Sequence, residues 1–265
     1  MRDIHVNEDI LLEEGFTEYC IDSNRDLDLS IRCQNHSQAL FRIKRAKSLR
    51  IRGFADDGVE STVLFWNECE APLRCEENYE VNSGSHLVVA YGECAGAAVD
   101  RSAYMALRKP EAHGELVSAS LVNEQVSYRM NVVNFAPHTL GEIRNFAVVL
   151  KHGTLMIDAI GKIVKGAVRS KSHQTSRALS FEEGQRSTIL PELLIDENDV
   201  EASHAMSIGR VDDEQLYYMM SRGLSLPQCT ALLSAGYLLP VTDVIDNEEV
   251  RSALRSELER KLSAL

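Results

Sequence analysis

The sequence predicts a mainly β protein with a helical C-terminal region, and three observations carry this prediction. From Phe16 to about Val200, apolar residues alternate with polar ones in short runs, which is the period of a half-buried strand. These runs recur about every ten residues, as in an all-β sandwich, barrel or solenoid. After about residue 206, apolar residues instead recur every three or four positions, as in amphipathic helices.

The chain begins with a short apolar segment that we expect to be helical. Ile4, Ile10, Leu11 and Leu12 stand among acidic residues, and Gly15 follows as a stop signal. We therefore predict a short N-terminal helix over residues 1–15. The alternating runs that follow it are centred on Leu29, Phe41, Phe65, Val89, Ser118, Tyr128, Val148 and Ile157.

The connections between these runs leave two β architectures open. Most runs are separated by isolated glycines, such as Gly84 and Gly114. Asp57-Gly58 is the exception, because this dipeptide is typical of a two-residue hairpin turn. Isolated glycines suit the sharp corners of a β-solenoid, but a sandwich also accommodates the alternation. At about 20–25 residues a coil, a solenoid would hold about seven to nine coils.

The C-terminal region predicts three helices. Asp or Ser at the N-cap and Gly at the end delimit helices over 212–223 and 225–236. Apolar residues at three- and four-residue spacing predict a third helix over 246–262. We therefore expect a β core over 1–205 and a helical domain over 206–265 that caps the end of this core.

Composition and charge exclude several classes of partner. The 265 residues carry a net charge of −12, which would repel a phosphate backbone, so we expect no nucleic-acid partner. No apolar run approaches the roughly 20 residues that cross a bilayer, and the N-terminus lacks a signal-peptide pattern. We therefore expect a cytoplasmic protein without a membrane partner. Its cysteines should be buried thiols without disulfides, and they are Cys20, Cys33, Cys69, Cys75, Cys94 and Cys229.

Motifs of catalysis are absent from the sequence. It contains no nucleophile elbow, no P-loop and no dinucleotide-binding glycine pattern. We therefore predict that the chain is not an enzyme. A β-helix enzyme acting on acidic polysaccharide remains an alternative, as does a purely structural solenoid that binds a partner through its edge.

The stretch from Pro191 to Gly223 reads PELLIDENDVEASHAMSIGRVDDEQLYYMMSRG. It resembles the C-terminal signature of the SufB/SufD family, which are scaffold components of the SUF system for iron–sulfur cluster assembly, and it is more similar to SufD. Weaker similarity extends from about Pro137 to Tyr237. The resemblance implies a right-handed parallel β-helix, which decides between the two β architectures. Typical SufD proteins are longer, so this chain resembles a short version of the family.

His204 is the candidate metal ligand that this resemblance implies. In SufD-like proteins the histidine at this position is implicated in cluster assembly at the interface with SufB. The usual motif has a cysteine where this chain has Ala202, and the glutamate of SufB is replaced by Ala205. We therefore expect no stably bound cofactor, and only a transient iron–sulfur cluster shared with a partner. The expected subunit interface comprises Pro191, Glu192, Leu194, Val200 and His204.

The C-terminal helices resemble the docking site for SufC, an ABC-type ATPase. The expected partners are thus a SufC-like ATPase and either a SufB-like subunit or a second copy of this chain. Three further histidines, His113, His138 and His152, are expected on different coils. The sequence does not determine the register between coils, so it does not predict whether any of them lie together. The residues expected to contact the ATPase are Leu216, Tyr217, Met220, Arg222, Ser225, Leu232 and Leu233.

Overall fold

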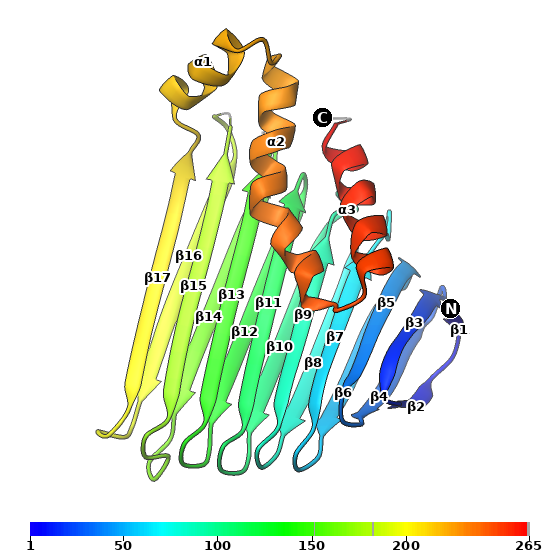
Figure 1. The fold of residues 1–265 in the computed structure, drawn as a ribbon, viewed down its shortest axis with the longest axis vertical. Coiled ribbons are helices and arrows are strands. Elements are labelled where there is room, and N and C mark those ends of the chain that lie inside the picture. The colour runs from blue at the N-terminus through cyan, green and yellow to red at the C-terminus, as the bar shows by residue number, and fades with distance from the viewer. Residues whose placement is uncertain (151, 182, 264–265) are drawn as a thin grey trace.

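The chain folds into two facing parallel sheets that are wound from one continuous coil (Figure 1). The computed structural model describes residues 1–150, 152–181 and 183–263. Consecutive strands alternate between the sheets, and each strand pairs in parallel with the strand two positions away in sequence. This is a β-solenoid of about seven turns, as predicted.

The odd-numbered strands form sheet A and the even-numbered strands form sheet B. Sheet A comprises β1 (Arg2–Ile4), β3 (Gly15–Asp22), β5 (Ser37–Arg45), β7 (Glu60–Asn67), β9 (His86–Glu93), β11 (His113–Val122), β13 (Leu140–Val149), β15 (Lys171–Ser180) and β17 (Glu201–Arg210). Sheet B comprises β2 (Glu8–Leu12), β4 (Asp26–Cys33), β6 (Ser48–Ala55), β8 (Leu73–Val81), β10 (Val99–Leu107), β12 (Gln125–Asn134), β14 (Thr154–Ile163) and β16 (Arg186–Ile195).

An aromatic column shows how the alternating pattern builds the core. Tyr19, Phe41, Phe65 and Tyr91 are register partners on successive strands of sheet A, and all four point between the sheets. Their rings stack at centroid distances of 4.7, 5.1 and 6.1 Å. In a parallel ladder without register slips, each residue lies beside its equivalent in the next coil. Side chains of one kind therefore stack through the core.

The prediction of a helix over residues 1–15 is wrong. The segment forms β1 and β2, and Gly15 begins β3. Ile10 and Leu12 are buried and Leu11 between them is exposed, so the period is two. The consecutive apolar residues conceal this alternation, and the pairing of β2 with β4 decides the conformation.

The coils lengthen along the chain. Gly15 pairs with Ser37 near the start of sheet A, whereas Lys171 pairs with Glu201 at its end. The difference in residue number between two such partners is the length of one coil, and it is larger for the second pair. The later coils are therefore longer than the predicted repeat. The strand structure also continues to Arg210, beyond the expected boundary at residue 205.

The helical C-terminal region is confirmed, but it does not lie where we expected it. The segments α2 (Leu226–Leu238), η1 (Leu239–Val244) and α3 (Glu248–Leu262) pack on the outer face of sheet A, over its middle strands (Figure 1). Trp66, Ala90 and Val117 point outward and form a second core with these helices. Of the α-helices that the structure describes, α1 (Asp213–Ser221) alone stands beyond the end of β17.

The anchor of α3 on this face is polar. Glu257 accepts hydrogen bonds from Trp66 Nε1 at 3.1 Å and from Arg42 Nη1 at 2.9 Å. Burial by itself would raise the pKa of Glu257, but these two hydrogen bonds hold it below its ordinary value. Thus the helices cover the middle of the sheet, and they leave the last coil uncovered.

Candidate functional site

The last coil, β16 with β17, is one open end of the solenoid. Strand β17 pairs with β15 on one side, and no other described strand pairs with it on the other. All ten of its residues are exposed, whereas β11 is buried along almost its whole length. An unpaired strand edge presents a row of free backbone donors and acceptors that can pair with another chain.

Most inward positions of the last coil are apolar, and the polar ones are Ser187, His204 and Arg210. Met206 and Ile208 continue the inward-facing columns of Ser176 and Ala178, and are 49% and 43% exposed. No further described coil covers them. These side chains therefore contact solvent, whereas the equivalent side chains of earlier coils contact the next coil. The apolar inward positions on β16 are Ile189, Pro191, Leu193 and Ile195, which pair with inward residues of β14.

His204 ends one such inward column. Leu116, Ile143, Gln174 and His204 are successive register partners on β11, β13, β15 and β17. The Gln174 amide nitrogen donates to the Glu192 carbonyl oxygen at 2.9 Å, while its Oε1 atom is buried without a hydrogen-bond partner among the described residues. The column thus changes from apolar to polar as it reaches the open end.

The structure brings some of the expected interface residues together and separates others. Pro191 and His204 both point into the open end. Glu192 and Leu194 point to the outer face of sheet B, as partners of Ile160 and Lys162. Val200 lies in the connection between the two strands.

The last coil itself, from Arg186 to Arg210, contains no cysteine. All six cysteines of the chain are free and buried, as predicted. Burial raises the pKa of Cys33 to about 11 and that of Cys94 to about 12, so both stay protonated at neutral pH. Any sulfur ligand to a metal at His204 would therefore have to come from elsewhere than these six buried side chains.

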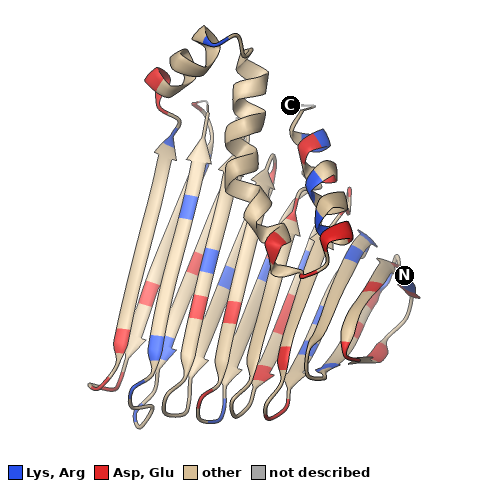
Figure 2. Cartoon of the chain, in the orientation of Figure 1, with Lys and Arg blue, Asp and Glu red and all other residues tan. Residues whose placement is uncertain are grey.

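The residues expected to bind the ATPase form a second exposed surface. Helix α1 has no buried residue, and Tyr217 and Met220 are 76% and 46% exposed. Leu232, on α2, is exposed, and Leu233 beside it is half-buried. Helix α2 carries no charged residue, as its uniform tan colour shows (Figure 2).

Capping interactions fix the bend between these two helices. Asp212 caps α1, and Ser225 forms a capping box with Gln228 at the start of α2. Arg222 lies 5.2 Å from the ring centroid of Tyr218.

No single described helix is long and apolar enough to span a membrane. Helices α1 and α2–η1 have the required length and composition only as a pair, and a bend of 118° separates them.

Sequence reasoning missed a third cluster, on the outer face of sheet A. His113 lies beside His86 on the neighbouring strand, and both imidazoles contact Glu115. The H-x-E pattern at 113–115 was readable as two side chains on one face of a strand. The contribution of His86 depends on the register between coils, which only the structure supplies.

Comparison with known proteins agrees with the fold and with the motif. Residues 70–237 match the family model described as SUF system FeS cluster assembly, SufBD core domain. The iron–sulfur cluster assembly protein SufD of Bacillus subtilis is 38% identical over 136 residues, which cover 51% of this chain and 31% of that protein. The corresponding SufB protein of Bacillus subtilis is 24% identical over 195 residues, 70% of this chain and 40% of that protein.

A SufBD family protein of Pyrococcus horikoshii is 37% identical over 90 residues, 34% of this chain and 20% of that protein. Each of these matches thus spans less than half of the relative's length. The fold is that of a two-sheet parallel β-solenoid with an open last coil. The chain belongs to the SufBD family, and it is more similar to SufD than to SufB.

Proposed function

We propose that this chain is a scaffold subunit of a SUF-type iron–sulfur cluster assembly complex. It would pair through its last coil with a SufB-like chain or with a second copy of itself. The observation that carries the proposal is the open end of the solenoid, where a strand edge, an apolar lining and His204 are all exposed. Membership of a family of scaffold-type assembly subunits supports this role over that of a polysaccharide-active enzyme.

Pairing at this end would cover both the free backbone groups of β17 and the exposed apolar side chains of the last coil. A partner strand laid along β17 would bond its free backbone N–H and C=O groups, as in β-strand addition. The inward side chains Met206, Ile208 and Ile195 would then be covered by the partner's last coil. Two copies related by a two-fold axis would present the same patch to each other, as an isologous interface requires.

His204 would lie inside this interface. The imidazole nitrogen is a suitable ligand for iron, and the cluster is cargo that the complex assembles and passes on. Since Ala202 and Ala205 flank His204 without donor atoms, this chain offers one ligand there. Since all six cysteines of this chain are buried, the thiolate ligands of a cluster would come from a SufB-like partner and not from a second copy of this chain.

The second contact in the proposal is with a SufC-like ABC ATPase. It would use the exposed surface of α1 and α2, including Tyr217, Met220 and Leu232, with Arg222 and Ser225 at its centre. Exposed Tyr, Met and Arg are the residues that protein interfaces favour. Nucleotide-driven closure of two ATPase subunits would then change the angle between the paired scaffolds.

Co-purification with the SufC-like ATPase and the SufB-like chain of the same organism tests these contacts separately. Tyr217→Asp should remove the ATPase and leave scaffold pairing intact, whereas Met206→Asp should do the reverse. If either variant folds normally but loses both contacts, the claim that the two surfaces act independently is contradicted. In cells, His204→Ala should lower the activity of iron–sulfur enzymes, and unchanged activity would favour the purely structural solenoid.

A further inference from the structure

A cluster of metal-ligating side chains lies on the outer face of sheet A, away from the last coil. His86 is the first residue of β9, His113 and Glu115 stand two residues apart on β11, and Glu142 is on β13. His86 pairs in register with His113, and Glu115 pairs with Glu142. Two adjacent columns of the parallel ladder therefore project two imidazoles and two carboxylates to one side.

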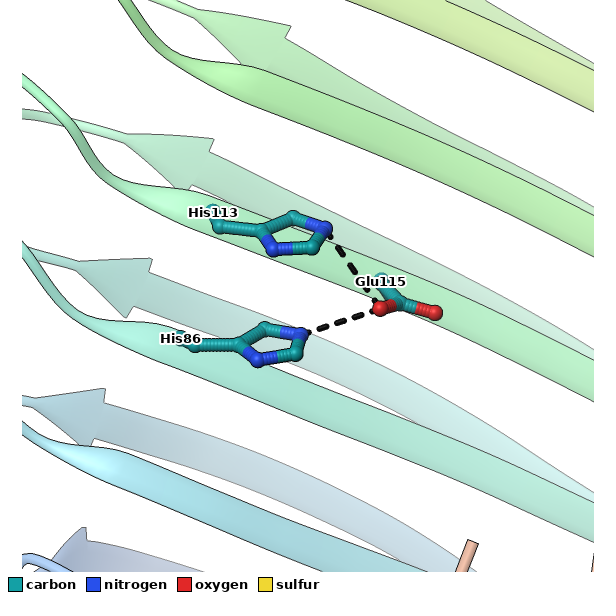
Figure 3. Close-up of side chains that lie close together, drawn as sticks. All are labelled: His86, His113 and Glu115. Atoms are coloured by element: carbon teal, nitrogen blue, oxygen red, sulfur yellow. Dashed lines mark hydrogen bonds and ion pairs between the residues drawn. The ribbon is translucent and has the colours of Figure 1, made fainter.

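The donor atoms converge on one carboxylate oxygen (Figure 3). Glu115 Oε1 lies 2.9 Å from His86 Nε2 and 3.4 Å from His113 Nε2. One ligand atom from each of these three residues falls within 4.8 Å of the others. In a tetrahedral site with bonds of about 2.0–2.1 Å, neighbouring ligand atoms are about 3.4 Å apart. Both nitrogen–oxygen separations are thus already near the value that a bound ion requires.

The surroundings orient the carboxylate toward an ion. Arg144 on β13 donates to Oε2 of Glu115, which leaves Oε1 directed at the imidazoles. Glu142 Oε2 lies 3.0 Å from His113 Nε2, outside the group of three donors, and it could reach an ion by a change of side-chain rotamer. Such outer-shell hydrogen bonds fix ligand geometry in metal sites. The two carboxylates outnumber the one guanidinium beside them, and this excess of negative charge favours a cation.

The two rings have room to adjust to an ion. They stack with centroids 3.9 Å apart and an interplanar angle of 2°. Each lone pair lies in the plane of its own ring, so coordination of one ion needs the rings to tilt toward each other. The His86 and His113 side chains are 35% and 26% exposed, which allows this tilt and gives an ion access from solvent.

We propose that His86, His113 and Glu115 bind one divalent first-row transition-metal ion, of the type of Fe²⁺, Co²⁺ or Zn²⁺, with Glu142 as the additional donor. Imidazole nitrogen with carboxylate oxygen selects such borderline ions over Mg²⁺ and Ca²⁺, which prefer all-oxygen sites. Three strand steps of about 4.8 Å separate this ladder position on β11 from β17. The site is therefore distinct from His204, and it does not depend on the proposed function.

Titration of the purified full chain with Co²⁺, after removal of metals with a chelator, tests this site. Calorimetry should give one Co²⁺ per chain, and visible ligand-field absorption should report nitrogen and oxygen ligands. His113→Ala should weaken binding at least about tenfold, and His86→Ala combined with it should abolish binding. His5→Ala, which removes an exposed histidine elsewhere, should bind as the wild type does. A hundredfold excess of Mg²⁺ should not displace Co²⁺.

The melting temperature of each variant, measured without metal, is the control for correct folding. Co²⁺ should raise this temperature in the wild type and in His5→Ala, because an ion that binds only the folded chain stabilises it, but not in the double variant. Should His113→Ala fail to fold, Glu115→Gln keeps the side-chain shape and should still lose Co²⁺. The proposal is overturned if the wild type binds no Co²⁺, or if the double variant binds it as tightly as the wild type.

Discussion

The middle coils and the last coil are built from the same ladder, yet they differ in what covers them. In the middle, Leu116 and Ile143 are fully buried, with a coil on either side. At the end of the same column, His204 has a coil on one side only. A solenoid closes its core by adding coils, so an uncovered final coil has either to be capped or to pair.

The middle coils even bury charge, which the last coil does not. Arg101 is buried between Glu77 and Glu93, with Nη2 2.7 Å from Glu93 Oε1. The Tyr79 and Tyr91 hydroxyls donate to Glu77 Oε2 at 2.6 and 2.7 Å. Such a network is tolerated only where surrounding coils hold every partner in place. The contrast indicates that the interior of the solenoid supplies stability, and it agrees with the proposal that the last coil is a pairing surface.

The largest expected effect comes from breaking the buried network. Arg101→Met leaves the Glu77 and Glu93 carboxylates without their cation, so it should lower the free energy of unfolding by about 3–5 kcal/mol. Urea denaturation measures this loss. Replacing all three charged residues with apolar ones of similar volume should recover only part of it, because the buried Tyr79 and Tyr91 hydroxyls then lose their acceptor on Glu77. A loss below about 1 kcal/mol in the single variant would mean that the network is not a closed unit.

A matched pair of methionines sharpens the comparison. Met105 is fully buried in a middle coil, and Met206 is half exposed in the last coil. Met105→Ala should cost about 2–5 kcal/mol, because it opens a cavity. Met206→Ala should change the stability of the isolated chain by less than about 0.5 kcal/mol. Equal losses in the two variants would show that the last coil is already covered.

A third, smaller loss than those of the buried Arg101 and Met105 concerns the helices on the sheet. Glu257 has a pKa held below its ordinary value in the folded chain. Its contribution is therefore complete above the ordinary pKa and is lost as the pH falls through the lower, folded-state pKa. Glu257→Gln should cost about 1–2 kcal/mol at neutral pH. From about pH 5 to about pH 3, the wild type should lose more stability than the variant; parallel pH profiles would contradict this.

Some of the fold could be read from single residues, because the strand period is local. Phe41, Phe65 and Tyr91 marked inward positions correctly, since alternation is visible without knowledge of partners. The position of the helices was missed, although Val63–Trp66 is an unbroken apolar run. Such a run is typical of a strand buried on both faces, and the outward Leu64 and Trp66 contact the C-terminal helices.

The two candidate metal sites also differ in whether local sequence alone can predict them. His204 is predicted from a contiguous motif, and the structure places it, exposed, on the last strand of the solenoid. The cluster of His86, His113 and Glu115 required register, because its two histidines lie one full coil apart in the sequence and meet only through the pairing of β9 with β11. Coil length varies along the chain, so this register cannot be counted from a fixed repeat.

Light scattering coupled to size-exclusion chromatography tests the central claim, that the last coil is a pairing surface. The chain would be measured alone and mixed with the SufB-like chain of the same organism, beside Met206→Asp. We predict a dimer, either of this chain or of the two chains, that Met206→Asp converts to monomers with unchanged thermal stability. A wild-type chain that stays monomeric in both samples, or a dimer that Met206→Asp leaves intact, would contradict the account.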